Sequence, residues 1–106
     1  MNYDLNLAQD LILCSANNNG PQYNAAVARL AGFFRDGTYD TAKAVGMLER
    51  NLVQSTAKQL HKDYHSDVAN WQDVFPMNLR LYAAQTLEES IVSEFELGNF
   101  PHSLPD

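Results

Sequence analysis

Apolar residues recur with the period of an α-helix in four separate segments of this chain, and this periodicity constrains the fold more than any other feature. It is clearest over residues 21–35, where apolar side chains follow the i, i+3, i+4, i+7 spacing of one helix face. Similar patterns predict helices over residues 4–16, 40–64 and 76–97. No segment shows the two-residue alternation of a half-buried strand. The sequence therefore predicts an all-α fold.

Residues that favour helix ends lie at the borders of these segments. Asp4 is placed to cap the first helix, and either Thr38 or Asp40 is placed to cap the third. Gly98 fits the left-handed position that often ends a helix. Between the third and the last segment the pattern breaks, and a short helix or turn is expected near residues 67–74. We therefore predict a single-domain bundle of four main helices plus this short element.

The chain is long enough to build one hydrophobic core without disulfides, since it has 106 residues of which 45% are hydrophobic. We expect one helical domain over residues 1–106, with an irregular tail over residues 100–106. In the third helix the pattern predicts that Tyr64 faces inward and Glu49 outward. Gly46 is the expected weak point of this helix.

The acidic residues are concentrated in the second half of the chain. Residues 1–62 contain six Lys or Arg and five Asp or Glu, whereas residues 63–106 contain eight acids and one base, Arg80. Such a surface repels phosphate backbones and attracts basic proteins. We therefore expect no direct nucleic-acid binding, and we expect a partner with a basic surface.

Composition also bears on the location of the protein. Cys14 is the only cysteine, which excludes a disulfide within the monomer and suits a reducing compartment. No run approaches the ~18 apolar residues of a membrane span, and the first residues lack the positive charges of a signal peptide. The expected location is the cytoplasm, away from the membrane.

No motif of a known catalytic site is present, so we expect no enzymatic activity and no cofactor. Glu88 and Glu89 point about 100° apart on a helix, which makes them a poor hydrolytic pair. His61 and His65 have the spacing that stacks two imidazoles on one helix face, but they span an expected helix end and lack the adjacent Glu of a metalloprotease motif. We predict no metal site, and a small metal- or ligand-binding bundle stays an alternative.

A set of distinctive residues is spread over residues 36–100. It comprises Gly37-Thr38-Tyr39-Asp40, Ala57, Tyr64, Trp71, Phe75-Pro76, Arg80, Ala83-Ala84 and Glu94. With this set, the stretch resembles a pattern found in small uncharacterised proteins of bacteriophages and plasmids, over about 60% of the chain. The resemblance implies an accessory protein of a mobile element, a class that includes inhibitors of host defence. It implies no catalytic residue.

The small size, the missing catalytic signature and the acidic second half together predict a non-catalytic protein-binding module. In its concrete form this is a phage or mobile-element inhibitor that occupies a basic groove of a host nucleic-acid-processing or defence complex of the CRISPR type. The residues expected to contact the partner are Asp67, Asp73, Glu88, Glu89, Glu94 and Glu96. The alternative is a self-associating structural module, in which the acids serve solubility and the chain forms homo-oligomers.

Overall fold

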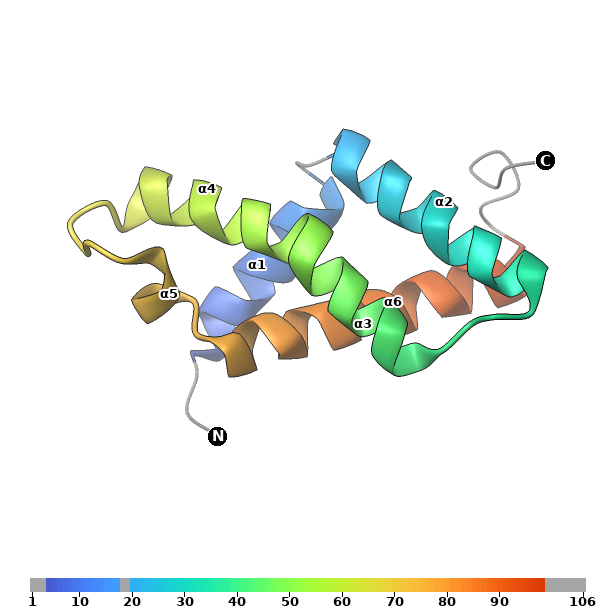
Figure 1. The fold of residues 1–106 in the computed structure, drawn as a ribbon. Coiled ribbons are helices and arrows are strands. Elements are labelled where there is room, and N and C mark those ends of the chain that lie inside the picture. Colours follow the sequence, from blue (N-terminus) through green and yellow to red (C-terminus); the bar gives the residue numbers. More distant parts are fainter. Residues whose placement is uncertain (1–3, 18–19, 99–106) are drawn as a thin grey trace.

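Helices form most of the part of the chain that the computed structural model describes, residues 4–17 and 20–98 (Figure 1). The elements follow in the order α1 (Leu5–Asn17), α2 (Gly20–Asp36), α3 (Thr41–Leu48), η1 (Glu49–Val53), α4 (Gln54–Tyr64), α5 (Trp71–Val74) and α6 (Met77–Leu97). The all-α prediction is confirmed, and the short helix expected near residues 67–74 is α5. The predicted tail, residues 100–106, lies outside the described residues.

The predicted third helix is continuous, but its middle segment η1 is a turn of π-helix. The N–H of Gln54 donates to the carbonyl of Glu49, five residues earlier. A π turn inserts one residue into the α-helical register, and such insertions are rare in regular helices. The irregularity expected at Gly46 therefore lies three residues further along.

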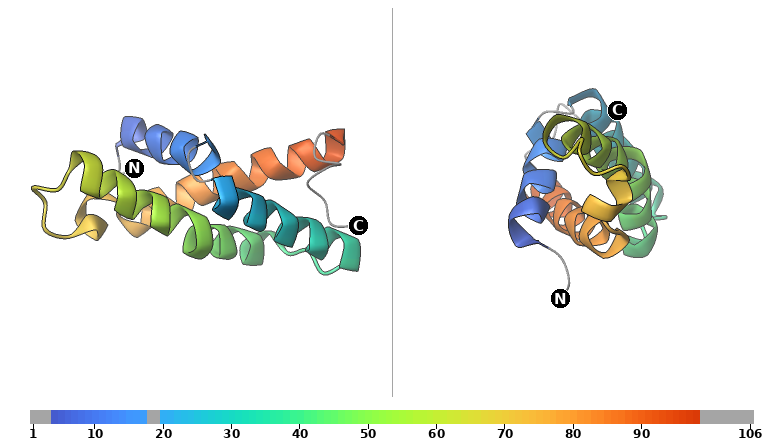
Figure 2. Two further views of the ribbon diagram at one scale, coloured as in Figure 1. Left: turned by 90° about the horizontal axis from the view of Figure 1, so that it is seen from above. Right: turned by 90° about the vertical axis from the view of Figure 1, so that its left-hand side faces the viewer.

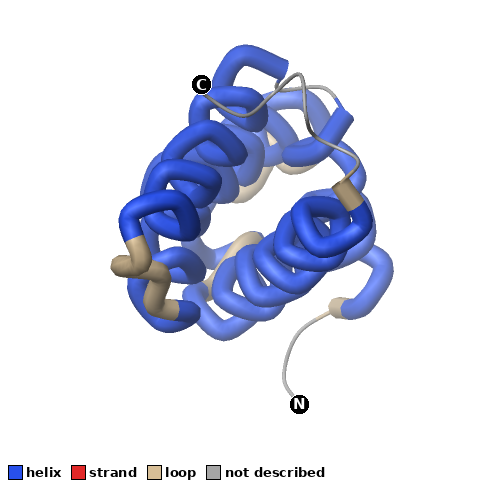
Figure 3. Tube along the Cα trace, turned by 90° about the vertical axis from the view of Figure 1, so that its right-hand side faces the viewer, coloured by secondary structure: helices blue, strands red, loops and turns tan. Residues whose placement is uncertain are grey.

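The continuous helix α3–η1–α4 and helix α6 run antiparallel along the length of the molecule (Figures 1 and 2). Helices α1 and α2 follow one another along this pair, α1 packing on α4 and α6 and α2 on η1 and α3. Seen along its long axis in Figure 3, the bundle places its helices around one shared core. The molecule measures 45 × 25 × 19 Å. Its largest fully buried side chains include Phe75, Leu11, Leu30, Leu48, Leu52, Leu79 and Ile91.

The predicted helix ends are confirmed where side chains or backbone conformation define them. The Asp4 carboxylate accepts N–H bonds from the first turn of α1 at 2.9 and 3.3 Å. Asp40, rather than Thr38, caps α3 by accepting the N–H of Ala42 at 3.0 Å. Gly98 ends α6 with a φ of 73°, in the left-handed region that glycine adopts without steric cost. These caps place the helix ends within a residue or two of the prediction.

Two predictions about the third helix were wrong. Tyr64 is 74% exposed, because it is the last residue of α4 and Phe75 fills the core at this end of the bundle. Glu49 is 4% exposed, because Arg80 reaches it from α6 with an ion pair. In both cases, contacts between elements decide whether the side chain is buried. The apolar periodicity of a single helix carries no information about such contacts.

Candidate functional site

An open groove of about 690 Å³ lies between α3 and the middle of α6. The α3 wall is formed by small side chains. Because these side chains are short, they leave the space between α3 and α6 open to solvent. Helix α2 lies on another side of the long helix, where a separate groove is lined by α2 residues together with Met47 and Asn51. The residues that line the groove are Thr41, Ala42, Val45 and Gly46 from α3, and Leu81, Gln85, Glu88 and Glu89 from α6.

Glu88 belongs to the wall of this groove but is only 6% exposed. Its carboxylate accepts a hydrogen bond from the Tyr39 hydroxyl. The Tyr39 ring stacks on Phe34 with 4.1 Å between centroids, and Phe34 meets the edge of Phe95 at 5.5 Å. The prediction that Glu88 faces a partner as an exposed carboxylate was therefore wrong, because Tyr39 holds this carboxylate in place from the turn before α3.

Burial raises the pKa of Tyr39 above its ordinary value of 10, and the hydrogen bond and charge of Glu88 raise it further. The folded state thus favours the neutral phenol. A group whose pKa is raised on folding contributes stability that is fully present below its unfolded pKa and is lost as the pH rises toward its folded pKa. The contribution of Tyr39 should therefore decline above about pH 10.

Tyr39→Phe is expected to lower the free energy of unfolding by about 1–3 kcal/mol at neutral pH, because it leaves a buried carboxylate without its donor. The difference from wild type should shrink at about pH 11, where ionisation of the unfolded tyrosine already weakens the wild-type protein. Urea denaturation at both pH values measures this. Tyr64→Phe is the control, because the exposed Tyr64 side chain should change stability by less than about 0.5 kcal/mol. A loss equal to that of the control would contradict the assignment.

The other acids predicted on α6 separate into two groups. Glu89 and Glu96 are exposed, and their spacing of seven residues places them on one face of the helix. Glu94 is half-buried. The pKa of Tyr23 on α2 is raised, mainly because the Tyr23 side chain is partly buried and further because of the negative charge of Glu94. Glu94 therefore lies close enough to α2 to act on Tyr23, and Glu89 and Glu96 are the fully exposed acids of α6.

Asp67 and Asp73 are exposed, but they lie far from the acids at the other end of α6. Asp67 belongs to the connection between α4 and α5, and Asp73 to α5 itself, at the end of the bundle where α6 begins (Figure 2). The rise of an α-helix puts Glu89 about 18 Å along the axis from the start of α6 at Met77. The six predicted residues therefore do not form one cluster.

The exposed charge of the second half is nevertheless of one sign. Between residues 63 and 98, the exposed or half-buried side chains of Asp, Glu, Lys and Arg are all acidic. Arg80, the one base of this stretch, is 4% exposed and paired with Glu49. Burial of this pair removes the only guanidinium from the surface of α6, so the outer side of that helix carries negative charge without a compensating cation of its own.

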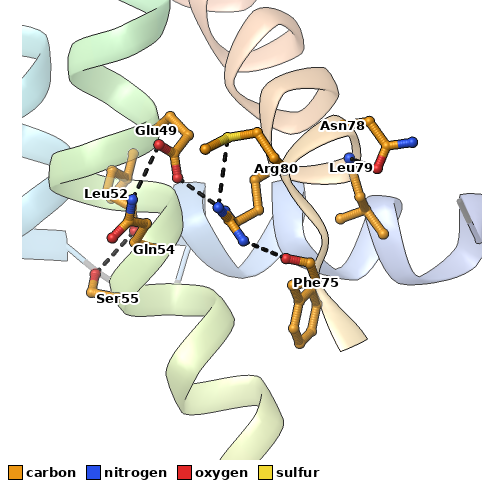
Figure 4. Close-up of polar contacts among 9 residues, drawn as sticks. Glu49, Leu52, Gln54, Ser55, Phe75, Asn78, Leu79 and Arg80 are labelled. Atoms are coloured by element: carbon orange, nitrogen blue, oxygen red, sulfur yellow. Dashed lines mark hydrogen bonds and ion pairs between the residues drawn. The ribbon is translucent and has the colours of Figure 1, made fainter. Parts of the chain in front are cut away.

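The Arg80 guanidinium lies at the centre of a network that ties α6, α5 and η1 together (Figure 4). Its Nε donates to a carboxylate oxygen of Glu49 at 3.1 Å, and its Nη1 donates to the Phe75 carbonyl at 2.5 Å. Gln54 donates to the other Glu49 oxygen at 3.1 Å. The guanidinium also lies 4.8 Å from the centre of the Trp71 ring. The donors and acceptors of this network pair with each other inside the protein. We therefore infer that the network stabilises the fold.

Some of the distinctive residues between positions 36 and 100 lie in or near this network. Trp71, Phe75 and Arg80, three of these residues, contact one another here. Tyr39 and Asp40, from the first distinctive run, hold Glu88 and cap α3. In this structure these five residues fix a helix end and the packing between helices.

The two histidines do not share one helix face. His61 is hydrogen-bonded through Nε2 to the Val68 carbonyl. His65 lies just beyond the end of α4 and meets the Phe75 ring edge-on at 6.5 Å. Among residues 4–17 and 20–98, no three His, Cys, Asp or Glu side chains gather closely enough to hold a metal ion. The geometry gives no support to the metal-binding alternative.

The groove itself was not predicted from the sequence. One signal for it was available, because Met77, Leu81, Gln85 and Glu89 are four residues apart and form a ridge beside the buried stripe of α6. The small α3 residues that face this ridge carry no such signal, since nothing in the sequence shows which helix lies opposite them.

Comparisons with family models, with curated proteins and with solved structures found no match to this chain. Within the described part of the chain, no helix has both the length and the apolar character needed to cross a bilayer. The features of the molecule that bear on function are therefore its fold, its groove and its distribution of charge.

Proposed function

We propose that this chain is a non-catalytic protein-binding module that recognises a basic surface of its partner. The observation that carries the proposal is the charge of the second half, where the exposed Asp, Glu, Lys and Arg side chains between residues 63 and 98 are all acidic. Complementary charge raises the rate of encounter and selects among partners, whereas apolar contacts supply most of the affinity. The groove beside α6 offers such contacts through Val45 and Leu81.

The concrete form of the proposal is an inhibitor of a host nucleic-acid-processing or defence complex, such as a CRISPR-type complex, acting in the cytoplasm. These complexes hold nucleic acid in positively charged channels. A small acidic helical protein can compete for such a channel without performing any chemistry. The resemblance to accessory proteins of bacteriophages and plasmids supports this form, and the negative surface supports the mode of binding.

The acidic residues near the end of α6 lower the stability of this helix, and this cost favours the proposal. Negative side chains near a helix C-terminus are unfavourable by a few tenths of a kcal/mol each, because they oppose the helix dipole. Glu94 and Glu96 lie in the last turn of α6, and no base accompanies them there. Binding of a basic partner to these carboxylates explains why the chain keeps them despite this cost.

Reversing the charge of Glu89 and Glu96 together should weaken binding by about tenfold at low salt and flatten its salt dependence. Affinity for the partner recovered from a lysate, measured across a salt series, tests this. The matched control is Asp10→Lys with Asp36→Lys, which changes the net charge equally at two exposed sites in the first half of the chain. Equal effects of the two double variants would show a response to net charge only, and an unchanged affinity of the α6 variant would refute the acidic-surface model.

Self-association is the second candidate function, and several exposed apolar side chains favour it. Leu97 is 70% exposed, Leu5 60% and Leu13 49%. Sedimentation over a range of concentrations separates the two candidates. A homodimer that persists at the lowest measurable concentration supports self-association, whereas a monomer throughout supports the binding of another protein.

A further inference from the structure

The groove between α3 and α6 has the form of a docking site for a helix. Its volume of about 690 Å³ lies within the roughly 300–1,000 Å³ that is usual for binding sites. Thr41, Ala42 and Gly46 keep the α3 wall low, and a side chain from outside can reach the apolar surface of Val45 between the helices.

The α6 wall is a ridge whose character changes along its length. Leu81 at its start is 36% exposed, although it is apolar. Gln85 and Glu89 follow at a spacing of four residues, and both are exposed. This wall covers about 12 Å from Leu81 to Glu89, the length of about two helical turns. It therefore offers an apolar contact at one end and an acidic contact at the other.

Charge is also distributed across the groove, and this restricts how an occupant can lie. The α6 wall carries Glu89 at its rim and the buried Glu88 carboxylate behind it. On the α3 side, a Cβ at Gly46 would lie 3.2 Å from a guanidinium nitrogen of Arg50, so this cation flanks the opposite wall. A basic side chain of an occupant is attracted by the α6 wall and repelled by Arg50.

We propose that the groove binds an amphipathic basic helix of a partner protein, with apolar side chains toward Val45 and Leu81 and with Lys or Arg toward Glu89. The inference rests on the proposed function, and it adds the site and the class of partner segment. Helix binding in an apolar groove is a common mode of recognition, in which side chains spaced i, i+3, i+4 and i+7 act as anchors. The flanking charges then set the orientation of the bound helix.

Three synthetic peptides of about 16 residues, long enough to cover the ridge, test this inference. The first has leucines on one helical face and lysines and arginines beside them. The second has glutamate at every basic position, and the third has serine at every leucine position. Titration of the labelled protein, followed by its amide resonances in NMR, gives both the affinity and the location of each peptide. The first peptide should shift the resonances of Ala42, Gly46, Leu81 and Gln85, and the other two should bind at least about tenfold more weakly.

Two variants of the protein test occupation of the groove. Ala42→Leu fills the groove at an exposed position and should weaken binding of the first peptide by about tenfold or more. Ala25→Leu, at an exposed position of α2 facing the other side of α3, should change it less than about twofold. Gln85→Lys places a cation in the groove without filling it and should weaken binding to a similar extent, so the test stands even if Ala42→Leu folds poorly.

Resonance shifts elsewhere, equal binding of the acidic peptide, or no binding of the first peptide would overturn the groove assignment. These outcomes differ from failure of the proposed function. If capture of a partner still depends on Glu89 and Glu96 while the groove stays empty, the acidic surface binds its partner by another route. If capture does not depend on those residues, the proposed function itself fails.

Discussion

Arg80→Met is expected to lower the free energy of unfolding by about 3–5 kcal/mol, because it leaves the Glu49 carboxylate buried without its charge partner. Glu49 and Arg80 are each 4% exposed and 3.1 Å apart, so water does not replace the lost ion pair. The variant also removes the donor to the Phe75 carbonyl. The predicted loss is a large share of the roughly 5–15 kcal/mol that stabilises a typical domain. Urea denaturation followed by circular dichroism measures it.

Arg50→Met is the matched control for this variant. Arg50 neighbours Glu49 in the chain but is exposed, so its replacement should change stability by less than about 0.5 kcal/mol. Replacing Glu49 and Arg80 together by methionine should recover much of the loss, because an apolar pair leaves no buried charge. If Arg80→Met were as stable as Arg50→Met, Arg80 would be exposed in solution. The acidic surface of α6 would then contain a cation, and it would attract a basic partner less strongly.

Phe75→Ala should be similarly destabilising, with an expected loss of about 3–5 kcal/mol from the missing apolar surface and the cavity left behind. Phe75 is fully buried, and it is the largest of the fully buried side chains in the described part of the protein. It lies between α5 and α6, so the cavity would loosen the end of the bundle at which Arg80 binds. Thermal and urea denaturation of the variant measure the loss.

A graded series makes the Phe75 prediction specific. Phe75→Leu keeps most of the apolar volume and should cost less than about 1.5 kcal/mol. Tyr64→Ala removes an aromatic ring that is 74% exposed, and it should cost less than about 0.5 kcal/mol. If Phe75→Ala and Tyr64→Ala were equally stable, Phe75 would not close the core.

The sequence predicted the helices well because their determinants are local. The apolar spacing of residues 21–35 and the caps at Asp4, Asp40 and Gly98 are properties of short segments, and the structure confirms them. The short helix near residues 67–74 was also expected, because Pro76 separates it from α6.

The candidate site was predicted less well, because its determinants are contacts between distant segments. Glu49 and Glu88 are both buried, and each is stabilised by one residue far along the chain, Arg80 or Tyr39. A charged residue in a helical pattern is normally assigned to the solvent side, since isolated charges are rarely buried. The π turn at Glu49–Val53 adds a change of register that regular periodicity does not describe. The sequence therefore indicated the negative charge of the second half but not which carboxylates reach its surface.

Capture of a partner from the native host tests whether this chain is a protein-binding module for a basic surface. The wild-type protein and the Glu89→Lys, Glu96→Lys double variant are used to recover partners from a nuclease-treated lysate of the native host, and mass spectrometry identifies them. We expect a stoichiometric partner rich in Lys and Arg that the wild type retains and the double variant loses. Recovery of the wild-type chain alone, or of the same partner by both proteins, would contradict this proposal.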